Sequence, residues 1–149
     1  MGASICRPAQ GGIAAEPDSC GQPANLSGRG SHFPTLVVEV SHSQSLQSLR
    51  RLMQWWFVGS DHYVMIVLLA NFNKSTKTLV IEKWIEEAST FTLQPKLDRT
   101  ITIAQLAGSS VASCQVFGTD LVLEFEHLML RAPESDETNI TISTDALKV

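Results

Sequence analysis

The amino-acid sequence predicts one α/β domain with a mixed β-sheet built on a strand–helix–strand core. Three observations predict this class. A β-branched run at 35–40 is followed by leucines at helical spacing from Ser45 to about Phe57, and then by a second apolar run at 63–71. Strands joined by a helix normally lie parallel, whereas the short polar turn at 74–77 predicts an antiparallel hairpin. A sheet that contains both kinds of pair is mixed.

Length and composition fit a single globular domain. The chain has 149 residues, of which 44% are hydrophobic and 17% charged, and no run of 18 apolar residues that could cross a membrane as a helix. Glycine and proline are concentrated near the start of the chain. We therefore divide the chain into a loop-rich segment at 1–33, an α/β core domain at 34–131 and an acidic, polar C-terminal segment at 132–149.

The first strand and the helix have clear boundaries. The strand at 35–40 follows Pro34 and carries one charged residue, Glu39. Ser43 or Ser45 can cap the helix, and Gly59 can end it. The predicted inner face of the helix holds its large apolar side chains: Leu46, Leu49, Leu52, Met53 and Trp56.

The later elements follow from shorter patterns. The hairpin strand at 78–85 alternates, with Leu79, Ile81 and Lys83 on one face and Val80, Glu82 and Trp84 on the other. Beyond it we expect strands at 100–106 and 120–125, a turn at 108–110, a helical turn at 126–130 and a short edge strand at 140–142.

Charge is unevenly distributed along the chain. Residues 1–34 carry two charges of each sign, residues 35–85 carry five cations and three anions, and residues 86–149 carry four cations and ten anions, for a formal net charge of −4. This balance argues against a protein held to nucleic acid by bulk positive charge. A nucleic-acid partner would have to bind through the middle third of the chain.

Glu39 breaks the pattern of its strand. A lone carboxylate in a buried strand is unfavourable unless it is paired, protonated or bound to a cation, so Glu39 is a candidate site residue. From the residues alone we favour a simpler interpretation: Glu39 is solvated at the strand end, or it pairs with Arg50 or Arg51 on the following helix.

A longer string of residues resembles a known family. It comprises Glu16-Pro17-Asp18, then Phe33-Pro34-Thr35-Leu36-Val37-Val38-Glu39-Val40, and then Ser43-x-Ser45-Leu46-x-x-Leu49-Arg50 and Trp55-Trp56, followed by Ile81-Glu82-Lys83-Trp84. Over residues 16–131 the chain resembles the PD-(D/E)XK restriction-endonuclease-like superfamily, and within it a fungal branch akin to the Uma-type nucleases. The short PD…E signature has low specificity, whereas the string from Pro34 to Trp56 is considerably more specific.

The resemblance implies a site for a divalent metal. In such nucleases an Asp and a strand-borne Asp or Glu bind Mg²⁺, and a Lys two positions later acts on water. Asp18 and Glu39 match the two carboxylates, and they are the implied Mg²⁺ ligands. Ser41 stands at the Lys position, so the positive charge is missing there. Related proteins can place the basic group on the following helix, which makes Arg50 the third candidate catalytic residue, although arginine is too basic to act readily as a general base.

The start of the chain also differs from the family pattern. The family core normally has a helix and a strand before the first Asp, and only seventeen residues precede Asp18. We therefore expect a restriction-endonuclease-like fold that is incomplete at the N-terminus, through truncation or degeneration, and a nuclease-like domain with impaired catalysis. The alternative is a non-catalytic structural or protein-interaction module with the same core. The sequence has no secretory signal and its three cysteines have no metal-ligand spacing, so we expect an intracellular protein, in the cytoplasm or nucleus.

Overall fold

A strand–helix–strand unit forms the centre of the molecule. The computed structural model describes residues 16–24, 33–106 and 113–147. In it, strand β2 (Leu36–Ser41) is followed by helix α1 (Leu46–Gly59) and strand β3 (Ile66–Asn73), and the two strands pair in parallel. The Ser45 hydroxyl caps the helix by accepting a hydrogen bond from the Ser48 backbone N–H at 3.2 Å. The three central elements predicted from the sequence are therefore confirmed.

Strand β3 continues into antiparallel strands. A turn at 74–77 leads to strand β4 (Thr78–Ala88), which pairs with β5 (Leu93–Gln105), and β5 pairs with β6 (Cys114–Phe117). On the opposite side, the three-residue strand β1 (Ser19–Gly21) pairs antiparallel with β2. The result is a mixed six-stranded sheet in the order β1-β2-β3-β4-β5-β6, which confirms the predicted mixed α/β class.

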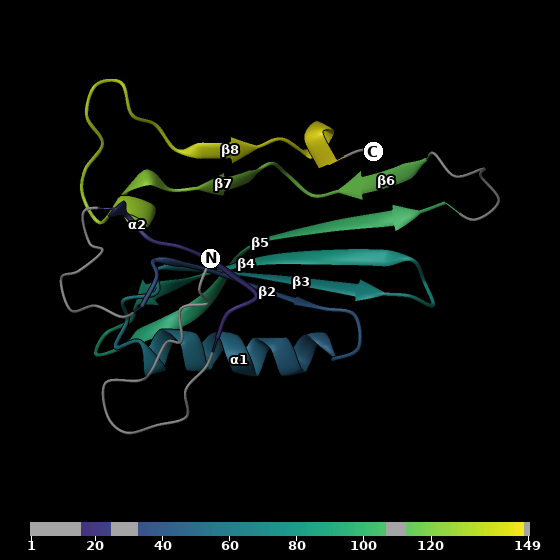
Figure 1. Cartoon of the computed structure of the whole chain (residues 1–149), viewed down its shortest axis with the longest axis horizontal. Helices are drawn as coiled ribbons and strands as arrows, with labels where there is room; N and C mark the ends of the chain where they lie inside the picture. Colours follow the sequence, from purple (N-terminus) through teal and green to yellow (C-terminus); the bar gives the residue numbers. More distant parts are fainter. Residues whose placement is uncertain (1–15, 25–32, 107–112, 148–149) are drawn as a thin grey trace.

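Three layers are visible in Figure 1, where α1 lies along one face of the sheet and the C-terminal elements lie on the other. The C-terminal layer contains strand β7 (Leu121–Leu123), helix α2 (Phe125–Met129), strand β8 (Ile140–Ile142) and the 3₁₀ helix η2 (Thr144–Leu147). Strands β7 and β8 form a separate antiparallel pair. The short strand predicted at 140–142, within the C-terminal segment, is β8 and belongs to this layer.

Each face of the sheet has its own apolar core. The face under α1 packs Val37, Val67 and Leu69 against the helix residues Leu49, Met53, Trp56 and Phe57. The other face packs Ile66, Leu68 and Ile101 against Leu121 and Leu123 of the C-terminal layer. Strands β2 and β3 are covered on both sides, which explains their nearly continuous apolar sequences.

Several elements differ from the sequence prediction. Strand β1 lies inside the segment expected to be loop-rich, β5 begins seven residues earlier than the predicted strand at 100–106, and β6 was not predicted. The predicted turn at 108–110 lies outside the described residues. The same physical reason applies to β1, to the first half of β5 and to β6. These segments are short or polar, and their backbone pairing is set by neighbouring strands rather than by their own periodicity.

Candidate functional site

Asp18 and Glu39 meet at one edge of the sheet. The antiparallel ladder of β1 and β2 ends at the pair Ser19–Val38, and Asp18 and Glu39 are the residues just beyond that pair on the two segments. The Asp18 carboxylate is near enough to act on Glu39 through its charge and through hydrogen bonding. The Asp18 carboxylate is also anchored, because its Oδ2 accepts a hydrogen bond from the Val40 backbone N–H at 2.7 Å.

Glu39 is buried beneath the helix and has no cationic partner among the described residues. Its side chain is 5% exposed, and its Oε1 accepts a hydrogen bond from the indole Nε1–H of Trp56 at 2.7 Å. Burial raises the pKa of the Glu39 carboxyl from 4.5 to about 7; the Trp56 hydrogen bond acts in the opposite direction, and the charge of Asp18 raises the pKa further. The simpler sequence interpretation, a solvated or arginine-paired Glu39, is therefore wrong.

Arg50 binds a different carboxylate. Its Nε donates to Oε2 of Glu82 at 3.0 Å, and its Nη2 binds the other oxygen of the same carboxylate. Glu82 is 2% exposed and also accepts a hydrogen bond from Trp84 Nε1 at 2.8 Å. The hydrogen bonds to Glu82 raise the pKa of Arg50. Arg50, the third candidate catalytic residue, thus forms an ion pair with Glu82 of β4 and not with Asp18 or Glu39.

Ser41 occupies the position where the resembled family has a lysine, and here it shapes the turn after β2. Its hydroxyl oxygen accepts hydrogen bonds from the backbone N–H groups of Gln44 at 2.8 Å and of Ser43 at 3.3 Å. These bonds lead the chain into α1, which begins five residues later. A neutral hydroxyl used in this way supplies neither positive charge nor a base to the neighbouring carboxylates.

The acidic pair can hold one proton or one cation between its carboxyls. Trp56 Nε1–H binds one oxygen of Glu39, the Asp18 backbone N–H also donates to the Glu39 carboxylate, and the Val40 N–H binds one oxygen of Asp18. The Asp18 carboxyl is close enough to hydrogen-bond with that of Glu39 and so contributes to its raised pKa. Mg²⁺ is commonly bound by one or two carboxylates together with water, so this donor set fits it. Within the described ranges, no group of three or more His, Cys, Asp or Glu residues is arranged to hold a metal.

The positive excess of the middle third is smaller at the surface than the sequence count indicates. Arg50 is paired with Glu82, and the fully buried Lys83 forms ion pairs with Asp98 at 2.9 Å and with Glu124 at 2.6 Å. Arg51, Lys74 and Lys77 are the remaining cations of residues 35–85, and all three are exposed. No helix in the described part of the chain is long and apolar enough to cross a membrane.

Two partners in this region were missed by sequence reasoning. The helical spacing placed Trp56 on the inner face of α1, but it gave no sign that the indole N–H would bind Glu39. The strand alternation placed Lys83 on the face opposite Glu82, which is confirmed, yet its partners lie 15 and 41 residues away in the chain. Asp98 reaches Lys83 from a bulge in β5, where the register shifts opposite Lys83 and Trp84.

Comparison with known proteins gives no family for the chain: it is detectably similar to no protein-family model, no curated protein and no solved structure. The resemblance to PD-(D/E)XK nucleases accordingly stays a prediction.

Proposed function

We propose that this chain is a nuclease-like domain with impaired catalysis that retains a vestigial site for a divalent metal. The observation that carries the proposal is the proximity of the Asp18 carboxylate to the buried Glu39 carboxyl at the β1 edge of the sheet, where Asp18 raises the pKa of Glu39. These residues were selected from the sequence by their similarity to the metal ligands of the PD-(D/E)XK superfamily. The proposed metal is Mg²⁺, which when bound stabilises negative charge on a phosphate group.

The surroundings of Glu39 support a cation as its natural partner. A buried carboxylate without a cation is unfavourable in its charged form, which is why its pKa is raised to about 7. The neighbouring Asp18 is exposed, so a hydrated ion can approach the pair from solvent. A bound Mg²⁺ would offset the desolvation of Glu39 and replace the shared proton.

Catalysis is proposed to be impaired because the basic group is missing. Ser41 is neutral and engaged in the turn, and Arg50 is bound to Glu82. Nothing else among the described residues of β2 or α1 offers a positive charge to the pair, since Arg51 lies on the exposed side of the helix. A nucleic-acid partner, expected from the middle third of the chain, is limited there to Arg51, Lys74 and Lys77.

The test measures metal binding and cleavage separately. We expect Mg²⁺ or Mn²⁺ to raise the thermal midpoint of the natural protein. The corresponding gain in the free energy of unfolding is about 1.4 kcal/mol when the metal concentration is ten times its Kd. The Glu39→Gln and Asp18→Asn variants should lose this effect, whereas Glu126→Gln, which removes an exposed carboxylate in α2, should keep it. Plasmid DNA incubated with the metal-loaded protein should stay intact.

Two outcomes would contradict the proposal. Folded protein whose stability does not respond to either metal would reject the metal site. Metal-dependent cleavage that disappears in Glu39→Gln would reject the impairment and make the chain an active Mg²⁺-dependent endonuclease, which hydrolyses phosphodiesters.

A second candidate function is a non-catalytic structural or protein-interaction module. It is favoured by two exposed apolar side chains at the turn between β4 and β5, Phe91 (94% exposed) and Leu93 (44% exposed). Under this alternative, metal has no effect and Phe91→Ser abolishes binding to a partner without changing the thermal midpoint. The metal experiment therefore separates the two candidates.

A further inference from the structure

A cavity of about 340 Å³ lies at the end of the sheet where β3 turns into β4. Its floor is a cross-strand row of apolar side chains, in which Phe72 pairs with Leu79 and Leu79 pairs with Ile103. Ile103 packs in the core on the side opposite α1, so the cavity opens on the other face of the sheet from the Asp18–Glu39 pair. It is therefore distinct from the proposed metal site.

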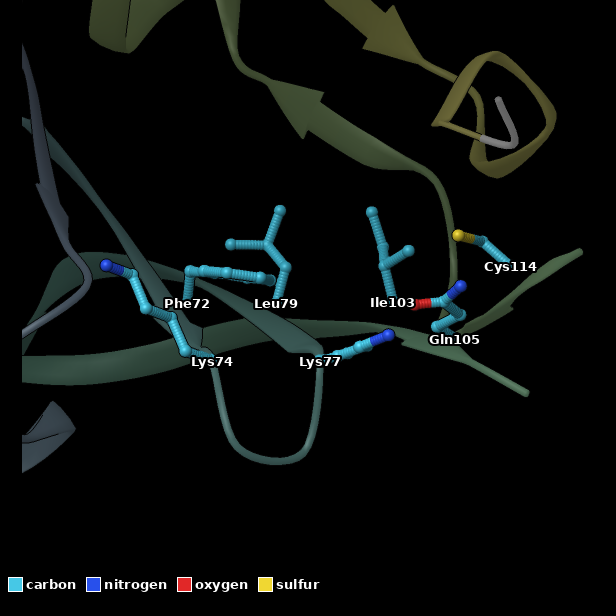
Figure 2. A pocket seen from close by; sticks show the side chains of 7 residues that line it. All are labelled: Phe72, Lys74, Lys77, Leu79, Ile103, Gln105 and Cys114. Carbon is cyan, nitrogen blue, oxygen red and sulfur yellow. The ribbon is translucent and has the colours of Figure 1, made fainter. Parts of the chain in front are cut away.

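Two lysines border this apolar floor. Lys74 and Lys77 come from the polar turn between β3 and β4, and both line the cavity. Figure 2 shows the Lys74 amine at the Phe72 end of the row and the Lys77 amine toward the end formed by Gln105. Both lysines are exposed, and no hydrogen bond or ion pair of either amine is found within the described ranges.

This combination is unusual for a surface of this chain. The protein has a formal net charge of −4, yet the cavity border carries two cations and no carboxylate, as its lining shows. An apolar floor is poorly solvated, and a volume near 300 Å³ is at the lower end of ordinary small-molecule sites. A ligand that complements both features has an apolar body and an anionic group.

We propose that the cavity binds an amphipathic monoanion, a carboxylate with a short apolar chain, such as a medium-chain fatty acid. The chain lies on the Phe72–Leu79–Ile103 row and the carboxylate pairs with a lysine amine at the border. Charge-assisted hydrogen bonds to the amine orient the ligand, and burial of the chain supplies affinity.

A nucleic acid fits the same cavity less well. A phosphate backbone requires cations spaced along an extended path. The other exposed cation of the middle third, Arg51, belongs to α1 on the opposite side of the sheet. The cavity floor is also apolar, whereas a nucleic-acid backbone is strongly hydrated. Two lysines around an apolar floor favour one small anion.

Cys114 provides a reporter inside the cavity. Its thiol is free, partly buried and part of the cavity lining, whereas Cys20 is free and exposed on β1 at the other edge of the sheet. Alkylation by iodoacetamide, followed by peptide mass spectrometry, reads the two cysteines in one sample. Cys20 is thus an internal control for reagent and pH.

The probes are decanoate below its micelle concentration, decanol and acetate. At ten times its Kd, decanoate should slow alkylation of Cys114 about tenfold and leave Cys20 unchanged. Decanol and acetate, which lack the charge or the chain, should protect weakly or not at all. The double variant Lys74→Met, Lys77→Met should bind decanoate about tenfold more weakly or worse, whereas Lys96→Met, which removes an exposed cation far along β5, should bind normally.

Three results would overturn the inference. The first is an unchanged Cys114 rate with decanoate, and the second is equal protection by decanol. The third is protection by a single-stranded oligonucleotide and none by decanoate, which would assign the lysines to nucleic acid instead. Because the substituted lysines are exposed, loss of folding does not complicate the comparison; far-UV circular dichroism checks this directly.

Discussion

Glu39 and Glu82 are two buried carboxylates in one row of the sheet with different partners. Leu69 of β3 pairs with Glu39 on one side and with Glu82 on the other, so all three side chains lie under α1. Each carboxylate accepts a hydrogen bond from an indole, Glu39 from Trp56 at 2.7 Å and Glu82 from Trp84 at 2.8 Å. Glu82 also binds Arg50 through both oxygens, whereas Glu39 faces the acid Asp18.

This difference separates a structural carboxylate from one that can change state. A guanidinium neutralises Glu82 and satisfies both of its oxygens, so the charge is already compensated within the fold. Glu39 has a hydrogen bond but no positive charge, and its pKa is raised to about 7. Among these two residues, only Glu39 has a chemical reason to take up a proton or a metal ion.

The largest expected effect comes from Glu39→Gln. The carboxyl has a pKa of 4.5 when solvated and about 7 in the fold, so the native state binds more protons than the unfolded state between these values. Stability therefore falls as pH rises from 4.5 to 7 and then levels. The amide variant lacks this loss, and relative to the natural protein it should gain about 3 kcal/mol between pH 4 and pH 9.

Urea denaturation of both proteins across this pH range measures the effect, because titrating groups that do not interact with Glu39 cancel in the difference and only its neighbour Asp18 is coupled to it. Glu126→Gln serves as the matched control, because it makes the same substitution at an exposed side chain. A Glu39→Gln curve parallel to that of the natural protein would contradict the assignment.

Arg50→Met removes the cation that is paired with Glu82, the second carboxylate of the comparison. It leaves Glu82 buried without a cation, which we expect to lower stability at pH 7 by about 2 kcal/mol. This is less than the roughly 3–5 kcal/mol lost on breaking a fully buried pair, because the Arg50 side chain is 43% exposed. Arg51→Met removes the same charge from an exposed position and should change stability by less than about 0.5 kcal/mol. Equal effects of the two substitutions would mean that the Arg50–Glu82 pair is not a structural contact in solution.

Trp56→Phe should have the smallest electrostatic effect, and its sign is informative. The indole hydrogen bond lowers the Glu39 pKa, so its removal should raise the pH midpoint of the Glu39 transition by about one unit. Trp84→Phe removes the matching donor from Glu82 and should leave that midpoint in place. Urea denaturation against pH measures the pH midpoint of the Glu39 transition in each variant. A midpoint in Trp56→Phe that is lower than in the natural protein would contradict the assigned role of the indole.

The sequence predicted the centre of the fold because its elements have strong periodicity. Leu49, Met53 and Trp56 mark the inner face of α1, and the alternation of β4 correctly separated Glu82 from Lys83. Strands β1 and β6 were missed because Ser-Cys-Gly of β1 has no β-branched residue and Cys-Gln-Val-Phe of β6 has one, whereas the equally short Ile-Thr-Ile of β8 is wholly β-branched. The first half of β5 was missed because it is polar and contains Pro95, so its pairing with β4 is set by the hairpin.

The candidate site was predictable only in part. Glu39 stood out as a charge in an apolar strand, and its proximity to Asp18 depends on the pairing of β1 with β2, a strand pair that the sequence did not reveal. Arg50 was expected near Glu39 because it lies on the helix that follows the strand, where the resembled family can place its basic group. It binds Glu82 instead, and that contact depends on the order of three strands, which no local pattern contains.

Direct titration of the Glu39 carboxyl tests the central claim. NMR detection of the side-chain carboxyl carbon against pH, in protein free of divalent metal, should give a pKa of about 7, assigned by its absence in Glu39→Gln. A value at or below 4.5 would contradict the claim, because it would mean that the carboxylate is solvated or already neutralised by a cation.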